Sequence, residues 1–83
     1  MALAALVRWE EACACYEQAV KYNDRDVWFW HNYGEALINT GRYVQASQTL
    51  ERALEIAPDH DTSRQLLERV RQLMDEETSD EHE

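Results

Sequence analysis

The sequence predicts an all-α fold of about four helices, arranged as antiparallel helix-turn-helix units. Apolar residues recur at alternating steps of four and three, which is the spacing of one helical face. The 83 residues include only two glycines and one proline, too few for a fold built from many tight turns. Hydrophobic residues make up 45% of the chain and charged residues 30%, a composition typical of a globular protein.

The first helix is predicted over residues 2 to 22, because no glycine or proline interrupts this segment. Cys13 and Cys15 would project about 200° apart on it, so we expect neither a disulfide nor a shared metal. Free cysteines favour a reducing compartment, and we therefore expect a cytoplasmic protein. The predicted buried face comprises Ala2, Leu6, Trp9, Cys13, Tyr16 and Val20.

The next two helices are predicted from Val27 to Thr40 and from Tyr43 to Ala57. The preceding segment, residues 23 to 26, carries short polar side chains that can bond the free N–H groups at a helix start. Gly41 suits the left-handed position that ends a helix. Pro58 ends the third helix, because it lacks a backbone donor and restricts the residue before it.

The fourth predicted helix follows Asp59 to Asp61 and buries only one side. Beyond about Glu76 the chain is acidic and lacks apolar anchors, so we expect residues 77–83 to form a disordered tail. The predicted helical domain covers residues 1–76. Its last apolar stripe consists of Leu66, Leu67, Val70, Leu73 and Met74.

A shift of 34 residues places similar residues in register along the chain. The matched pairs are Trp9 with Tyr43, Ala12 with Ala46, Tyr16 with Leu50, and Ala19 with Ala53. Within residues 27–60 the pattern reads Trp30-x2-Tyr33-Gly34-x2-Leu37, then Ala46-x3-Leu50, Ala53 and Pro58. This pattern resembles the tetratricopeptide repeat, W-x2-L-G-x2-Y, A-x3-F, A, P, with three conservative departures. The resemblance implies an α-solenoid of stacked helical hairpins.

The resemblance divides the chain into a full repeat over residues 27–60, a partial repeat over residues 1–26 and a capping helix over residues 61–76. Gly34 and Ala46 are expected to let the two helices of the full repeat approach closely. In the capping helix, Arg64, Glu68 and Arg71 replace the Trp, Gly and Tyr of the family pattern, as in a solvated closing helix. No comparable cap is evident at residues 1–26, which leaves two alternatives: a fragment of a longer repeat protein, or a homodimer.

The resemblance also implies a protein-protein interaction module whose concave groove takes an extended peptide or a partner helix. Trp28 is the sharpest candidate for contact, because Trp30 already occupies the core position and an additional indole is a typical binding anchor. The alternative is that Trp28 packs against the first helix. The expected groove face of the second helix comprises Trp28, His31, Glu35, Ile38 and Asn39.

Chaperone-binding members of this family clamp a C-terminal carboxylate with Lys, Arg and Asn. Asn32 fits one such position, but His31 and Glu35 stand where cationic and amide donors are needed. We therefore expect an apolar or basic peptide rather than a C-terminal carboxylate.

Other functions find little support in the sequence. The net charge is −9 and no cluster of Lys and Arg exists, so we expect neither a nucleic acid nor a membrane partner. No apolar run approaches the ~20 residues that span a bilayer. The three histidines lack metal-ligand spacing, and no glycine-rich phosphate loop is present, so we expect no enzyme, no metal and no cofactor.

Overall fold

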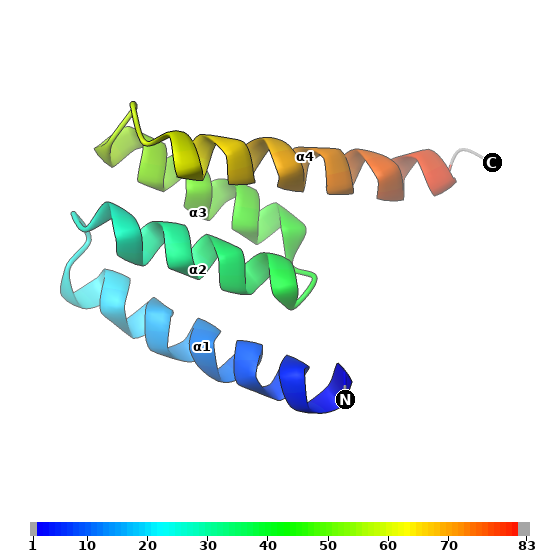
Figure 1. Ribbon diagram of the computed structural model, residues 1–83, viewed down its shortest axis with the longest axis horizontal. Coiled ribbons are helices and arrows are strands. Elements are labelled where there is room, and N and C mark those ends of the chain that lie inside the picture. Colours follow the sequence, from blue (N-terminus) through cyan, green and yellow to red (C-terminus); the bar gives the residue numbers. More distant parts are fainter. Residues whose placement is uncertain (1, 82–83) are drawn as a thin grey trace.

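The computed structural model describes residues 2–81, and these residues form four helices in an antiparallel array (Figure 1). Helix α1 spans Ala2–Tyr22, α2 spans Val27–Asn39, α3 spans Tyr43–Ile56 and α4 spans Asp61–Glu81. Helices α2 and α4 run in one direction, and α1 and α3 run in the other (Figure 1). The predicted all-α fold is therefore confirmed.

The ends of α2 follow the local chemistry expected from the sequence. At its start, the Asp26 carboxylate accepts a hydrogen bond of 3.0 Å from the backbone N–H of Trp28. At its end, Gly41 adopts a φ of +80°, a conformation that glycine reaches without steric cost. The N–H of Gly41 bonds the carbonyl of Ile38 at 3.0 Å, and the N–H of Arg42 bonds that of Leu37 at 2.9 Å. This pair of bonds is the Schellman motif, which satisfies carbonyls at a helix end.

The turn between α3 and α4 starts before Pro58, as predicted. Ala57 is extended, with φ −136° and ψ 87°, because the residue before a proline is excluded from the helical region. Helix α4 continues to Glu81, so the structure differs from the disordered tail expected over residues 77–81. No glycine or proline after Asp61 stops this helix. Residues 82 and 83 lie outside the described residues.

The core lies where consecutive helices stack. Helix α3 packs against both α2 and α4, and α1 packs against α2. Ala46, Ala53 and Gly34 provide the close approach that the repeat pattern predicts: both alanines are fully buried, and a Cβ added at Gly34 would lie 2.7 Å from the side chain of Leu50. The buried apolar residues are Cys13, Val20, Tyr33, Ala36, Leu37, Ala46, Leu50, Ala53, Leu67 and Val70.

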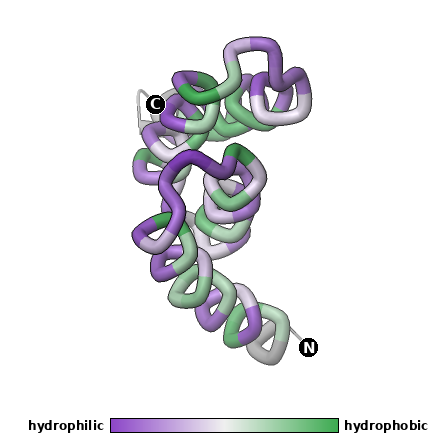
Figure 2. The backbone as a smooth tube through the Cα atoms, turned by 90° about the vertical axis from the view of Figure 1, so that its left-hand side faces the viewer, coloured by the Kyte–Doolittle hydropathy of each residue, from purple (hydrophilic) through white to green (hydrophobic). Residues whose placement is uncertain are grey.

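The molecule is a thin, curved array rather than a closed bundle. Its principal extents are 43, 31 and 17 Å, and the shortest is well under two helix diameters of about 10–12 Å each. Figure 2 shows the helices following one another along a curve, with hydrophilic turns at the end facing the viewer. None of the helices over residues 2–81 is long and apolar enough to cross a bilayer.

The two cysteines lie on different faces of α1, as predicted. Cys13 is buried and 5% exposed, whereas Cys15 is exposed to solvent, and both are free thiols. Burial is the main cause that raises the pKa of the Cys13 thiol, since a buried thiolate loses its hydration. Cys13 therefore acts as a small core residue.

Candidate functional site

A surface groove runs between α2 and α4, and we call it the α2–α4 groove. These two helices contact each other much less than either contacts α3, so a hollow remains between them. Glu35 and Arg69 line the hollow from opposite helices, together with polar and apolar side chains. The groove residues are Glu35, Ile38 and Asn39 of α2, Tyr43 of α3, and Leu66, Arg69 and Leu73 of α4.

The groove continues toward the N-terminal ends of α2 and α4. A second hollow there shares Glu35, Leu66 and Arg69 with the first. His31, Thr62 and Gln65 complete its lining. The two hollows therefore form one continuous strip from His31 to Leu73, bordered by successive parallel helices.

Glu35 and Arg69 are the charged groups of this strip. Among residues 5–77, whose side chains the structure describes, neither side chain forms an ion pair, although Asn39 donates a hydrogen bond of 2.9 Å to the backbone carbonyl of Glu35. An exposed carboxylate and guanidinium that have no ion-pair partner among the described side chains can each pair with a ligand of opposite charge. The groove thus offers a mixed surface of apolar contacts flanked by one negative and one positive charge.

The structure brings three of the five predicted groove residues together and places the other two differently. Glu35, Ile38 and Asn39 line the groove. Trp28 is 53% exposed but lies beyond the groove lining, with its ring in edge contact with His31 and His60 at 5.4 and 4.6 Å between ring centres. The partners of this indole are therefore imidazoles rather than the first helix.

His31 differs most from the expected open groove position. It is 8% exposed, and its Nδ1 lies 3.1 Å from the hydroxyl of Ser63 at the start of α4. Burial is the main cause that lowers the pKa of His31 below its ordinary value; the nearby Glu35 carboxylate opposes this shift, and His60 adds to it. His31 is therefore a neutral, largely covered group at one end of the groove.

The groove residues of α4 were absent from the sequence prediction, which treated this helix as a cap. The repeat itself carried the signal that identifies them. A shift of 34 residues places Glu35 on Arg69 and Asn39 on Leu73, so these pairs occupy equivalent positions on successive parallel helices. Equivalent positions of stacked hairpins face the same side of the array, which explains why they share one groove.

Comparison with family models identifies a known repeat. A model described as tetratricopeptide repeat matches residues 3–75, a range that includes every residue of the α2–α4 groove. A search of curated proteins found no match, and a search of solved structures found none either.

Proposed function

This chain belongs to the tetratricopeptide repeat family, and we propose that its α2–α4 groove binds a peptide segment of a partner protein. The family suggests a protein-protein interaction module in general and is generally non-catalytic. The observation that carries the proposal is that Glu35 and Arg69 line the same groove from α2 and α4, and that neither forms an ion pair among residues 5–77, whose side chains the structure describes.

The groove supports a particular ligand chemistry. Ile38, Leu66 and Leu73 offer apolar contacts to a hydrophobic side chain of the peptide. Glu35 offers an acceptor to a basic residue beside that anchor, and Arg69 offers donors to a peptide carbonyl or an acidic residue. The preferred ligand is therefore an apolar segment that carries a lysine or arginine.

Charge reversal at Glu35 tests this proposal. Peptides would first be selected on the wild-type chain from a random display library, and their affinities then measured by fluorescence polarisation. Glu35→Lys is expected to weaken the selected peptides about tenfold, because it replaces an attractive contact with a basic residue by a repulsive one. The Glu35 carboxylate forms no ion pair within the described residues, so the thermal midpoint should change little.

A matched control variant distinguishes an effect of the groove on peptide affinity from an effect of the net charge. Glu11 is exposed on α1, distant from the groove lining, and Glu11→Lys changes the net charge by the same amount. The control variant should bind the peptides as the wild type does. Equal affinity of wild type and Glu35→Lys, or an equal loss in both variants, would show that the peptides bind elsewhere.

We propose self-association through α1 as a second candidate function. Ala12, Cys15 and Ala19 of α1 correspond, one repeat period earlier, to three residues of α3, namely Ala46, Thr49 and Ala53. The α3 residues are between 0% and 6% exposed, whereas Cys15 is exposed and both α1 alanines are only half-buried. The same face that is covered in α3 is thus open in α1, which favours pairing with a second copy.

Sedimentation equilibrium under reducing conditions tests the dimer. The wild-type mass is expected to rise toward that of a dimer with concentration, and Cys15→Glu should abolish this rise because it places a charge in the small-residue face. Ala14→Glu is the control, since Ala14 is exposed and points about 100° away on the same helix. A wild type that stays monomeric at every concentration, or an Ala14→Glu variant that also loses the dimer, contradicts this candidate.

A further inference from the structure

Two histidines and one serine meet at the end of the α2–α4 groove. His31 of α2 and His60 of the α3–α4 turn both direct Nδ1 at the hydroxyl of Ser63, at 3.1 and 2.7 Å. Ser63 is fully buried, and the two imidazole centres lie 5.7 Å apart. One hydroxyl therefore connects a side chain of α2 to the turn that starts α4.

The hydroxyl of Ser63 carries one proton, which limits the hydrogen bonds that it can form with the two imidazoles. It can donate this proton to Nδ1 of one imidazole, and it then accepts from Nδ1 of the other. The backbone N–H of Ser63 also donates to Nδ1 of His60 at 3.3 Å.

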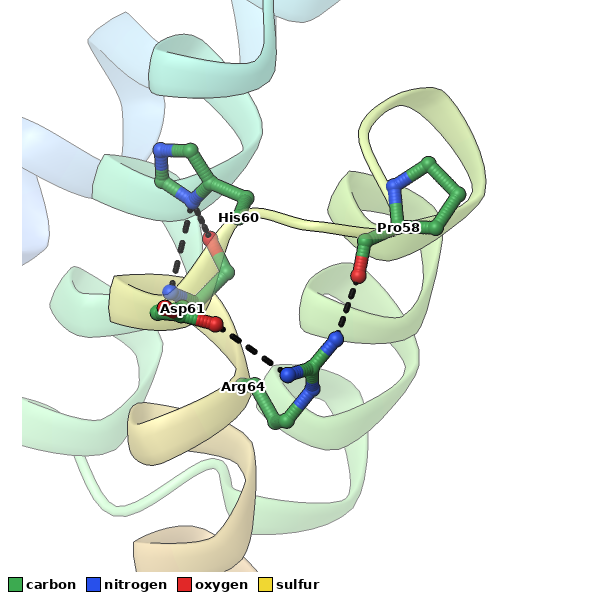
Figure 3. Close-up of polar contacts among 5 residues, drawn as sticks. Pro58, His60, Asp61 and Arg64 are labelled. Carbon is green, nitrogen blue, oxygen red and sulfur yellow. Dashed lines mark hydrogen bonds and ion pairs between the residues drawn. The ribbon is translucent and has the colours of Figure 1, made fainter.

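This arrangement has an additional role at the start of α4. His60 precedes the helix, and its Nδ1 accepts from the N–H of Ser63 three residues later, as an N-capping side chain does. Arg64 pairs with Asp61 at 3.1 Å and also donates to the carbonyl of Pro58, which braces the turn on its other side (Figure 3). Nε2 of His60 is buried and has no hydrogen-bond partner within the described residues.

We propose that His31, Ser63 and His60 form a proton-sensitive latch that fastens α4 to α2 and thereby sets the width of the groove. A proton added to His31 places a charge on a side chain that is 8% exposed, which is unfavourable as long as α4 covers this side chain.

The charged groups around the latch set the sign of the effect. Glu35 of α2 favours protonated His31, whereas His60 opposes it, and burial outweighs both, so the folded pKa of His31 lies below its ordinary value of 6.5. Arg69 of α4 lines the same hollow, and Asp59 and Asp61 flank His60. Because the unfolded chain binds this proton more readily, stability present above about pH 6.5 is lost as the pH falls and levels off below the folded pKa.

The latch matters for the groove because α2 and α4 have little other direct contact. Releasing it lets the first turns of α4 move relative to α2 while the α3 contacts of both helices persist. This regulation rests on the proposed peptide binding, but the latch itself is testable without any peptide.

The test is a pH titration of the isotope-labelled chain by ¹H–¹⁵N NMR, from about pH 7.5 to about pH 5.5, on both sides of the ordinary histidine pKa. The amides of Ser63, Leu66 and Ile38 should shift with one shared midpoint that matches the imidazole signals of His31. The thermal midpoint should fall over the same range, because the folded pKa of His31 lies below its ordinary value. Val44 is exposed on α3 and absent from the groove lining, so the chemical shift of its amide should not change with this midpoint.

Two variants separate the latch from general acid effects. Ser63→Ala removes the shared hydroxyl at a helical position that accepts alanine, and it should remove the shared midpoint and most of the fall in thermal midpoint. His82→Gln removes the remaining histidine, and it should change neither the shared midpoint of the amides nor the fall in thermal midpoint. Groove amides that stay unchanged while the His31 imidazole titrates, or a Ser63→Ala variant that keeps the full response, would overturn the latch. A latch that responds as expected in a chain that selects no peptide would instead count against the peptide-binding function alone.

Discussion

Leu37→Ala is expected to lower the free energy of unfolding by about 2–5 kcal/mol, because the side chain is fully buried between helices and its removal leaves a cavity. A domain of this size is stable by only about 4–12 kcal/mol. A large fraction of the Leu37→Ala molecules would therefore be unfolded near body temperature. Urea unfolding followed by circular dichroism measures the change.

The matched control for this substitution is Leu6→Ala. Leu6 is 40% exposed on α1, so the same chemical change removes far less buried area there, and the expected cost is below about 1 kcal/mol. Equal costs at the two positions would mean that Leu37 does not lie in the common core of the repeats.

Gly34→Val is expected to destabilise the fold by about 3 kcal/mol. Already the first added carbon would lie 2.7 Å from both Cγ and Cδ2 of Leu50, and this leucine is fully buried and cannot move aside. Helices α2 and α3 would have to separate, which opens the tightest contact of the repeat. Urea unfolding again gives the free energy, and Gln48→Val, an exposed change on α3, measures the effect of a valine in a helix without the steric conflict.

A double-mutant cycle identifies the cause. Leu50→Ala alone costs about 2–5 kcal/mol because it creates a cavity, but in the Gly34→Val background it also makes room for the new methyl groups. The double variant should therefore be more stable than the sum of the two single changes predicts. Strict additivity would show that valine at position 34 acts through the backbone rather than through Leu50.

The repeat pattern and the groove differ in how well the sequence predicted them. Gly34, Ala46 and Leu50 stand at family positions, and the structure packs them as the pattern predicts. Glu35, Ile38 and Asn39 were expected on the groove face because the family resemblance implies a groove there and helical spacing places them on one side, and they line one hollow. Peptide binding in this groove stays a proposal, as does the expected cytoplasmic location.

Three features of the fold could be read from local chemistry because each depends on neighbours in sequence. Asp26 caps the backbone two residues later, Gly41 supplies a positive φ, and Pro58 constrains the residue before it. The four helices and the repeat period follow from such signals together with apolar spacing. The sequence by itself thus determined that four helices form, where α2 and α3 end, and that the hairpins stack. It did not determine the end of α4, which continues to Glu81, or the environment of Leu6, which was expected on the buried face of α1 and is 40% exposed.

The tertiary structure decided what those stacked helices present to a partner. His31 and Ser63 are 32 residues apart, and only the docking of α4 beside α2 covers His31 and forms the polar contact between them. The same docking brings Arg69 opposite Glu35 and leaves Trp28 beside two imidazoles. Helical periodicity states which side of one helix a residue faces, but the neighbour it meets there depends on packing between distant segments.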